Sequence, residues 1–341
     1  MKVLVTGANG FLGREVVAAL VADGHEVRAL VRPATDVTRL KWGSAVEVAR
    51  ADLRGGAKLE PLLDGVEAVV HLATQMVGDD FTILSGTLVG SERLFAAMAT
   101  ARVKRLVLCS SFSVYDWLAA RGTLDDDGPL PADIWPSGAY AAAKHWQERL
   151  ARRAADQHGW KLTVLRPGFV WGRGNDDLAC VGQRFGRHQL VFGPWRKLPL
   201  THVSNCADAF RAVLTDERAL GKTFNLVDEQ GITAARYARE LARGTGRNGL
   251  TLWLPGLLTR ALVGLANLGA RIVFGLRYKL PSMFAPIRFD LRYKPVRATS
   301  SGLRALGWRA PRSFEDCVHA TWGPTGTVVQ LGADVPARRA A

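Results

Sequence analysis

Short apolar runs alternate with helix-like stretches along the first half of the chain. The runs at 3–6, 26–31, 46–49, 67–72 and 105–109 have the length and the valine and leucine content of buried strands. Between several of them, apolar residues recur at helical spacing instead. Strands that alternate with helices in this way predict an α/β fold built on a doubly wound, parallel sheet.

Glycines recur at Gly7, Gly10 and Gly13, directly after the first predicted strand and before the first predicted helix. Glycine permits the positive φ of a tight turn and lets the backbone approach a pyrophosphate, to which the helix N-terminus offers free N–H groups. The last glycine lets the helix pack closely on the strand. This position favours a dinucleotide-binding Rossmann domain over an ordinary loop.

The end of the second predicted strand favours NADP(H), with NAD(H) as the alternative cofactor. A sheet that binds NAD usually has an acid there for the ribose hydroxyls, whereas this chain has Arg32. A guanidinium has the charge and the forked donors that suit a 2′-phosphate, although a surface arginine would give the same pattern. After the third strand, Asp52 is placed to accept from the adenine amino group. His71 lies within an apolar run, and we expect it to be packed and hydrogen-bonded rather than a catalytic base.

The candidate catalytic residues are Ser111, Tyr140 and Lys144. The alanines at 141–143 favour helix, so Tyr140 and Lys144, four residues apart, share one helical face. A neighbouring ammonium is expected to lower the tyrosine pKa from about 10 and bring proton transfer closer to neutral pH. Ser111 follows the fifth strand, at the sheet edge where such folds bind ligands, and its hydroxyl can hold a substrate oxygen.

In combination, these motifs resemble the extended short-chain dehydrogenase/reductases, the NAD-dependent epimerase/dehydratase family, over almost the whole chain. The glycine loop matches TGxxGxxG, Tyr140 and Lys144 match YxxxK, and 166–172 resembles the RPxxVYG segment. The resemblance implies catalysis by Ser111, Tyr140 and Lys144 without a metal. It also implies cofactor contacts from Gly7, Asn9, Gly10, Phe11, Leu12, Gly13, Arg32, Asp52, Leu53, Leu72, Ala73, Lys144 and Pro167.

Two positions depart from the family pattern. Thr87 stands where the family usually has the asparagine of an NVxGT motif, so an orienting amide is lost. Phe112 and Ser113 follow Ser111, where the 4,6-dehydratase branch has an Asp-Glu pair. The second difference argues against dehydration.

Beyond residue 168 the sequence predicts a smaller, mostly helical substrate-binding region. We expect an NADP-binding domain at 1–168, to which 199–228 returns, a substrate region at 169–198 and 229–322, and a flexible tail at 325–341. Polar and aromatic loops are expected at 173–177 and 183–195. Four basic residues of this region would suit a sugar nucleotide but are equally common in surface loops: Arg184, Arg187, Arg196 and Lys197.

The stretch 254–276 is apolar except for a stripe at Arg260, Gly264, Asn267 and Arg271 along one helical face. The two arginines argue against a membrane span. We expect this helix to cap an apolar substrate pocket and to approach a membrane surface, with a packed core helix as the alternative. Basic and aromatic residues follow it, and the stretch resembles the 3β-hydroxysteroid dehydrogenase-like branch of the family. They are Arg277, Tyr278, Lys279, Met283, Phe284, Arg288, Phe289, Arg292, Tyr293 and Lys294.

The net charge of +14 is concentrated in one part of the 341-residue chain, since Arg236 to Arg312 holds 15 Lys and Arg against two acids. No nucleic-acid module accompanies the charge, which leaves an anionic cofactor, an acidic substrate, an anionic membrane or a solvated basic face. Four cysteines lie far apart without metal-ligand spacing, and the chain opens directly into a strand. We therefore expect a reduced, cytoplasmic protein without a signal peptide, with a peripheral location at the inner face of the membrane as an extension.

The sequence predicts an NADP(H)-dependent oxidoreductase that interconverts a secondary alcohol and a ketone on a hydrophobic, sterol- or terpenoid-like substrate. A nucleotide-sugar epimerase or reductase shares the catalytic residues and is the first alternative. A non-catalytic dinucleotide sensor is the second, but such proteins commonly lack YxxxK. We expect a small apolar substrate as partner, peripheral membrane contact through 254–297, no nucleic acid, and a homodimer formed by the helices around 85–100 and 140–156.

Overall fold

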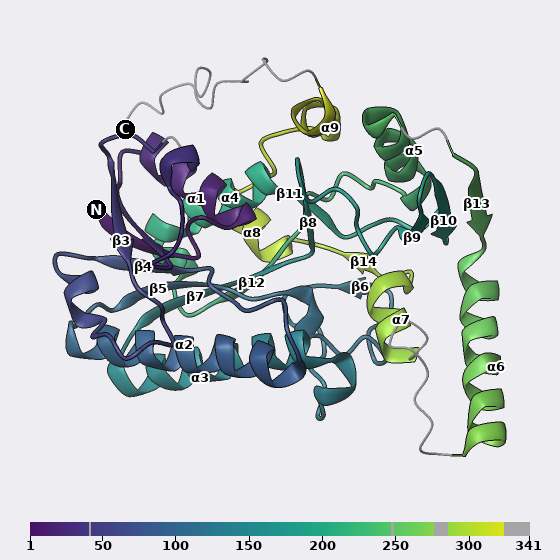
Figure 1. Cartoon of the computed structure of the whole chain (residues 1–341), viewed down its shortest axis with the longest axis horizontal. Coiled ribbons are helices and arrows are strands. Elements are labelled where there is room, and N and C mark those ends of the chain that lie inside the picture. The colour runs from purple at the N-terminus through teal and green to yellow at the C-terminus, as the bar shows by residue number, and fades with distance from the viewer. Residues whose placement is uncertain (41, 247–248, 276–285, 324–341) are drawn as a thin grey trace.

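The computed structural model describes residues 1–40, 42–246, 249–275 and 286–323. Within these residues the central layer is a parallel sheet of seven strands, with helices on both faces (Figure 1). The strand order is β12 (Thr223–Leu226), β7 (Lys161–Pro167), β5 (Arg105–Cys109), β4 (Ala68–His71), β1 (Lys2–Thr6), β2 (Glu26–Val31) and β3 (Val46–Arg50). The chain winds outward in both directions from β1 and β4, which confirms the doubly wound α/β fold. A crevice for ligands is expected where the direction changes, at the carboxyl ends of these strands.

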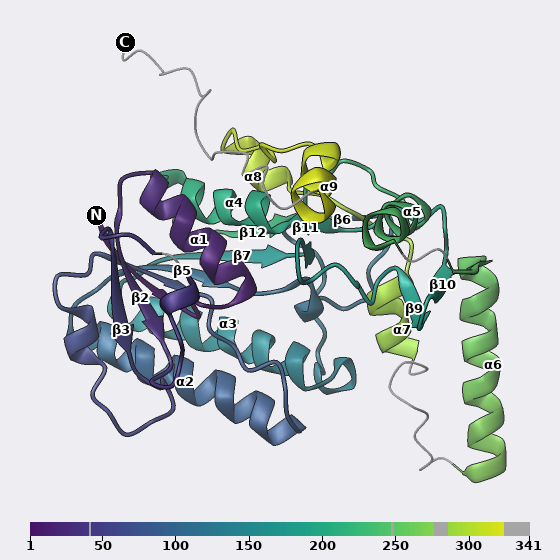
Figure 2. The ribbon, with the colours of Figure 1, turned by 45° about the horizontal axis from the view of Figure 1, so that its top comes forward.

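Helices cover both faces of the sheet (Figures 1 and 2). On one face α1 (Phe11–Ala22) and α4 (Val203–Thr215) pack on β1 through residues such as Val17 and Phe210. On the other, α2 (Asp80–Thr100) and α3 (Ala139–His158) pack through residues such as Met98 and Ala151. Because the sheet is buried on both faces, its strands are nearly continuous apolar runs, which explains why the sequence indicates them so clearly.

Several predicted elements coincide with observed ones, and others end elsewhere. The second and fifth predicted strands have the bounds of β2 and β5. The helix predicted from residue 85 begins at Asp80, because the Asp79 carboxylate caps it by accepting from Thr82 N at 2.8 Å. Strand β7 continues through Pro167, so Arg166 and Pro167 lie at its end rather than after it.

The remaining elements cluster beyond the carboxyl edge of the sheet. The described residues pair β8 (Phe169–Trp171) with β11 (Leu200–His202), and β6 (Thr123–Leu124) with β14 (Arg297–Ala298). A further sheet joins β9 (Gly182–Phe185), β10 (His188–Phe192) and β13 (Thr251–Leu254). Helices accompany them: α5 (Ala234–Thr245), α6 (Gly256–Phe274), α7 (Pro286–Tyr293), α8 (Ser301–Ala305) and α9 (Phe314–Trp322).

The loop predicted at 183–195 is wrong, because most of it forms the β9–β10 hairpin. Gly186, with φ of +60°, supplies the turn between the two strands. Val191 and Phe192 at the end of β10 are buried in two apolar clusters. This segment therefore forms strands because of its tertiary packing. Its own apolar pattern is too short to predict them.

Helix α6 lies along one outer edge of the molecule, beside α7 and below β13 in Figure 1. It begins two residues after the predicted start, since Leu254 belongs to β13. The predictions for the tail at 325–341 and for five residues that follow α6 lie outside the described residues. Those five are Arg277, Tyr278, Lys279, Met283 and Phe284.

Candidate active site

A cleft of about 860 Å³ runs along the carboxyl ends of the central strands. The ends of β2, β4, β5 and β7 all contribute to its lining, as the fold requires. Every residue that the sequence analysis proposed for catalysis or cofactor binding lines this cleft. They are Gly7, Asn9, Gly10, Phe11, Leu12, Gly13, Arg32, Asp52, Leu53, Leu72, Ala73, Ser111, Tyr140, Lys144 and Pro167.

The glycine loop has the shape of a phosphate cradle. Gly7 has φ of +68°, and its carbonyl accepts from Gly10 N at 3.0 Å. A Cβ on Gly13 would lie 2.1 Å from Gly7 O, so only glycine lets α1 start this close to the loop. Among the described residues no side chain caps the N-terminus of α1, which leaves its first N–H groups to face an anion. The loop therefore fits the pyrophosphate of a dinucleotide.

Arg32 stands at the far end of the cleft on a braced loop. Arg50, at the end of β3, donates from Nη1 to Pro33 O and Thr35 O, both at 2.9 Å, and so ties this loop to the sheet. The Arg32 side chain is exposed and forms no ion pair with any residue that the structure describes. Its guanidinium is free to meet a ligand phosphate.

Asp52 lies beside Arg32 but already has a partner that the sequence analysis missed. Arg54 donates to the Asp52 carboxylate from its backbone N at 2.9 Å and from Nη2 at 3.1 Å. These hydrogen bonds hold the pKa of Asp52 below its usual value. Arg54 also lines the cleft. Its position two residues after Asp52 in the sequence could have indicated that the two side chains pair. This end of the cleft thus has Arg32, Arg54 and Asp52 in its lining.

Ser111 and Tyr140 meet at the middle of the cleft. The Ser111 hydroxyl accepts from Ser113 N at 3.1 Å, which fixes its direction at the end of β5. The Ser111 side chain lies near the Tyr140 phenol and acts to lower its pKa. Burial nevertheless raises the pKa of Tyr140 to about 12, so the phenol stays protonated at neutral pH.

Lys144 does not lower the pKa of Tyr140 here, which corrects the expectation from their spacing. Its ammonium donates to Cys109 O at 2.7 Å and to Gln147 Oε1 at 3.0 Å, and burial lowers its own pKa. Sharing one helical face places both side chains on the cleft. Tertiary partners then decide where the ammonium points.

Gln147 supplies an amide near the position where the sequence has lost one. Its Oε1 accepts from Lys144, and its Nε2 donates to Ser91 Oγ at 2.8 Å. Thr87, which replaces the usual asparagine, accepts from Gln75 N at 3.1 Å instead. The sequence analysis missed Gln147, although its spacing of three residues from Lys144 puts both on one side of α3. Gln147 therefore orients the buried ammonium.

His71 is packed and hydrogen-bonded, as expected. Its Nδ1 lies 2.7 Å from Thr6 Oγ1 and its Nε2 lies 3.0 Å from Ser91 Oγ. Burial, with a smaller contribution from Lys144, lowers its pKa to about 3. The ring is therefore neutral at physiological pH and links the end of β1 to the network around Lys144.

This buried neutral histidine predicts acid-dependent stability. The unfolded chain takes up a proton near pH 6.5, whereas folded His71 does so near 3, so this stability is present above 6.5 and lost as pH falls toward 3. From this group alone, the free energy of unfolding should be about 2 kcal/mol lower at pH 5 than at pH 7. Urea unfolding at both pH values tests this, with His71→Gln as comparison. An equal pH dependence in both proteins would contradict it.

A buried ion pair fixes helix α3, which carries Tyr140, against the sheet. Arg166 donates to Glu148 Oε1 at 2.9 Å and to Oε2 at 2.7 Å. The same guanidinium lies 4.8 Å over the Tyr115 ring, whose hydroxyl donates to Asn225 Oδ1 at 2.6 Å. Arg166 of the RPxxVYG-like segment therefore acts structurally, by holding α3 on β7.

The end of the cleft beyond Tyr140 is lined largely by apolar side chains. These are Met76, Trp117, Phe169, Val170, Leu178 and Leu291, and charged groups enter from Asp177 and Arg292. In the described part of the chain, none of the basic residues considered for a sugar nucleotide lines it. Arg184 pairs with Asp177 at 3.4 Å, and Arg196 is buried and donates to Cys180 O.

The expected lid is not where the sequence analysis placed it. The lining includes Leu291 and Arg292 of α7 but no described residue of α6. The exposed apolar side chains of α6 lie on its outer face, described below, and do not cover the cleft. The prediction that α6 caps the pocket is therefore wrong for the residues that the structure describes.

Comparisons with known proteins identify a family model and several relatives that match this chain. A family model described as "NAD dependent epimerase/dehydratase family" matches residues 3–226. Sterol demethylase protein B of Methylococcus capsulatus is 41% identical over 324 residues, which cover 92% of this chain and 93% of that protein. A 3-beta-hydroxysteroid dehydrogenase of Mycolicibacterium neoaurum is 24% identical over 336 residues, covering 89% of each chain.

A solved structure of another protein has a fold similar to that of this chain. The Thermus thermophilus UDP-glucose 4-epimerase, crystallised with NAD, superimposes with a TM-score of 0.69 at 22% identity, covering 94% of this chain and 97% of that one. Likeness at this identity concerns the fold alone. The sheet and the smaller region beyond it thus belong to an architecture that is already known.

Proposed function

The chain belongs to the NAD-dependent epimerase/dehydratase family, and from that premise we propose that it is an NADP(H)-dependent oxidoreductase that interconverts a secondary alcohol and a ketone on a sterol-like substrate. Membership of the family implies a nicotinamide dinucleotide cofactor and oxidoreductase chemistry. NADP(H) preference and the sterol-like substrate are the finer parts of the proposal. The glycine cradle and the free N-terminus of α1 fit such a cofactor.

The observation that carries the substrate class is the apolar end of the cleft beside Tyr140. Trp117, Phe169, Leu178 and Leu291 offer a surface that favours a fused hydrocarbon skeleton over a sugar diphosphate. Arg292 and Asp177 supply the charged groups there. Two relatives that align with about nine-tenths of the chain are named for a sterol and a hydroxysteroid, which supports the same class.

The side chains at the middle of the cleft fit proton transfer to a carbonyl oxygen. When bound, NADP(H) supplies or accepts the hydride. The Tyr140 phenol, kept protonated by burial, is placed to give its proton to the substrate oxygen as the carbonyl is reduced. The Ser111 hydroxyl, fixed by Ser113 N, hydrogen-bonds the same oxygen. Lys144, held by Gln147, lies on the same cleft as Tyr140 and Ser111.

A nucleotide-sugar epimerase would share these three residues but needs a basic end for the diphosphate. Arg184 pairs with Asp177 and Arg196 donates to Cys180 O, and neither arginine lines the cleft. Arg292 is the arginine that the described part of the chain places among the apolar side chains. A non-catalytic sensor has no need of Ser111, Tyr140 and Lys144 on one cleft. Both alternatives therefore explain less of the site than the oxidoreductase does.

A substrate comparison tests the proposal. The purified full chain with NADPH should consume cofactor when given a 3-ketosteroid dispersed in cyclodextrin, and should not when given UDP-glucose. Nicotinamide absorbance follows the first reaction, and separation of UDP-glucose from UDP-galactose detects epimerisation. Turnover of UDP-glucose without turnover of any sterol ketone or alcohol would overturn the proposal.

Replacement of Arg32 tests the cofactor preference. The guanidinium provides a charge-assisted contact of about 1.5–3 kcal/mol to a 2′-phosphate, which NAD(H) lacks. Arg32→Ala should weaken NADP(H) binding about tenfold or more and change NAD(H) binding little. Titration of tryptophan fluorescence measures both affinities, and Arg153→Ala on the exposed face of α3 is the control. Equal losses for both cofactors, or tighter NAD(H) binding by the unchanged protein, would reject the assignment.

A further inference from the structure

Helix α6 exposes most of its apolar side chains to solvent, unlike an ordinary surface helix, which buries them. Its outward face consists of apolar side chains that are each more than half exposed, namely Leu257, Leu258, Leu262, Leu265, Leu268, Ile272 and Val273. Its inward face carries Thr259, Val263 and Asn267, of which the first two are buried. A soluble helix normally shows the opposite arrangement. An apolar surface this continuous marks a binding site.

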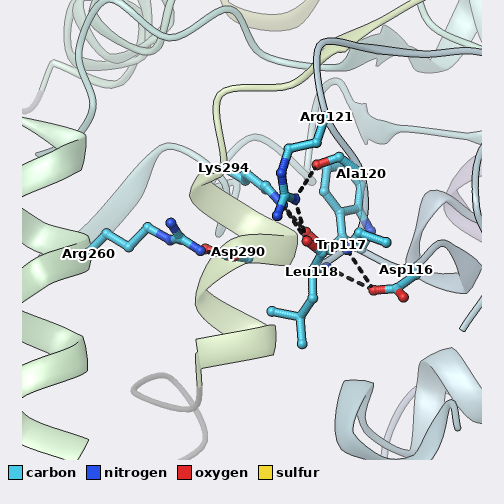
Figure 3. Close-up of polar contacts among 9 residues, drawn as sticks. Asp116, Trp117, Leu118, Ala120, Arg121, Arg260, Asp290 and Lys294 are labelled. Carbon is cyan, nitrogen blue, oxygen red and sulfur yellow. Dashed lines mark hydrogen bonds and ion pairs between the residues drawn. The ribbon is translucent and has the colours of Figure 1, made fainter.

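Helix α6 is held to the body of the protein through α7 (Figure 3). Arg260 of α6 donates to the buried Asp290 carboxylate of α7 at 2.9 and 2.8 Å. Val263 packs with Phe289 and Tyr293 of α7. The outward orientation of the apolar face is therefore set by defined contacts on the inner face.

Helix α7 continues this connection to the cleft. Lys294, directly after α7, donates from Nζ to Trp117 O at 2.6 Å and to Leu118 O at 3.0 Å (Figure 3). Trp117 lines the apolar end of the cleft, as does Leu291 of α7 itself. Helix α7 therefore connects α6 to the lining of the cleft.

Exposed apolar residues also occur on β13, the strand that precedes α6. Leu252 and Trp253 on that strand are also exposed, and Trp is a residue type enriched at membrane interfaces. The segment Gly256–Val273 is long and apolar enough to cross a bilayer, with a mean hydropathy of 1.3. However, the ion pair and packing of its inner face hold α6 against α7, which favours a helix that lies along a membrane surface.

The positive charge of this region indicates which kind of surface the outer face of α6 would bind. Between Arg236 and Arg312 the two acids, Glu240 and Asp290, are paired with Arg243 and Arg260. Two further arginines, Arg236 and Arg304, pair with acids outside this range, and the remaining basic residues leave the region positive. Arg271 lies exposed in the last turn of α6. The excess of positive charge complements anionic lipid head groups.

We propose that the outer face of α6 docks the protein on the surface of an anionic lipid bilayer, with the helix parallel to the membrane plane. A second copy of the chain could cover an apolar face but would not match its positive surroundings. Docking would place the apolar end of the cleft next to the membrane. The proposal stands on α6 itself and does not depend on the oxidoreductase assignment.

Vesicle flotation with the full chain tests this proposal. Phosphatidylcholine vesicles that contain phosphatidylglycerol should carry the protein upward, whereas phosphatidylcholine alone should carry far less, and high salt should reduce the binding. The double variant Leu265→Glu/Ile272→Glu should lose at least tenfold in bound fraction. Arg271→Glu should lose severalfold, because it alters charge while leaving the apolar face intact. Val48→Glu, on the exposed edge strand β3 at the opposite side of the molecule, should bind like the unchanged protein.

Three results would overturn the proposal. The first is absence of binding to the anionic vesicles, and the second is unchanged binding by both α6 variants. The third is a soluble dimer in analytical ultracentrifugation that Leu265→Glu/Ile272→Glu dissociates, with no vesicle binding, because a second copy would then occupy the face. Sterol turnover without vesicle binding would reject the docking alone. Vesicle binding without any sterol turnover would uphold the docking and reject the proposed activity.

Discussion

Replacing Tyr140 by phenylalanine is expected to lower turnover by about a thousandfold or more. The change removes the proton that the phenol would give to the substrate oxygen, and general acid catalysis contributes about 10²–10⁴-fold. The ring remains in its place on α3, so the dissociation constant for NADP(H) should change by less than about twofold. Steady-state kinetics with NADPH and a sterol ketone, together with fluorescence titration of the cofactor, measure the two quantities.

Tyr237→Phe is the matched control for this change. The Tyr237 hydroxyl donates to Asp176 O at 2.8 Å within an apolar cluster, so its loss should cost about 1 kcal/mol of stability without a comparable effect on turnover. Lys144→Met should reduce both turnover and cofactor affinity, because it removes the buried ammonium from the cleft. Turnover by Tyr140→Phe within a few-fold of the unchanged enzyme would make the acid assignment wrong.

Gly13→Ala is expected to abolish measurable dinucleotide binding, with at least about a hundredfold loss of affinity. The added Cβ would lie 2.1 Å from Gly7 O and 2.8 Å from Ala8 O, both backbone atoms, so α1 must move away from the loop. The movement displaces the N–H groups that face the pyrophosphate, and the crowding should lower stability by about 1–3 kcal/mol. Fluorescence titration and urea unfolding measure these two effects.

Gly264→Ala is the matched control, since a Cβ there meets no atom within 4 Å among the described residues. Alanine also favours the helix, so this variant should be as stable as the unchanged protein or slightly more stable. It should bind NADP(H) normally. Normal cofactor binding by Gly13→Ala would show that the loop tolerates a Cβ and would remove the argument that it cradles a pyrophosphate.

Much of this fold is predictable because its information is local. Strand β5 could be assigned as Arg105–Cys109 from its apolar residues alone, since a strand buried on both faces must be apolar throughout. The glycine loop is equally local, because Gly7 and Gly13 are required by the turn and by the approach of α1. The glycine loop and the carboxyl end of β5 both lie at the sheet edge where this fold binds ligands. The placement of the candidate site therefore follows from the order of the elements.

The features that the sequence left undetermined depend on contacts between distant segments. The pKa of Tyr140 follows mainly from burial, so its helical spacing of four residues from Lys144 was not sufficient to predict it. The Arg260–Asp290 pair joins residues thirty positions apart and turns the apolar face of α6 outward. The apolar stripe was visible in the sequence, but the side on which it lies is a tertiary property.

Transfer of deuterium from the cofactor to a sterol shows whether this protein reduces a sterol ketone. NADPH that carries deuterium at both C4 positions of the nicotinamide ring is incubated with the full chain and a 3-ketosterol, and mass spectrometry follows the sterol. We expect a sterol alcohol with deuterium on the new carbinol carbon, formed by the unchanged enzyme and not by Tyr140→Phe. A sterol fraction that stays unlabelled across sterol ketones, while the same protein epimerises UDP-glucose without net loss of cofactor, would contradict it.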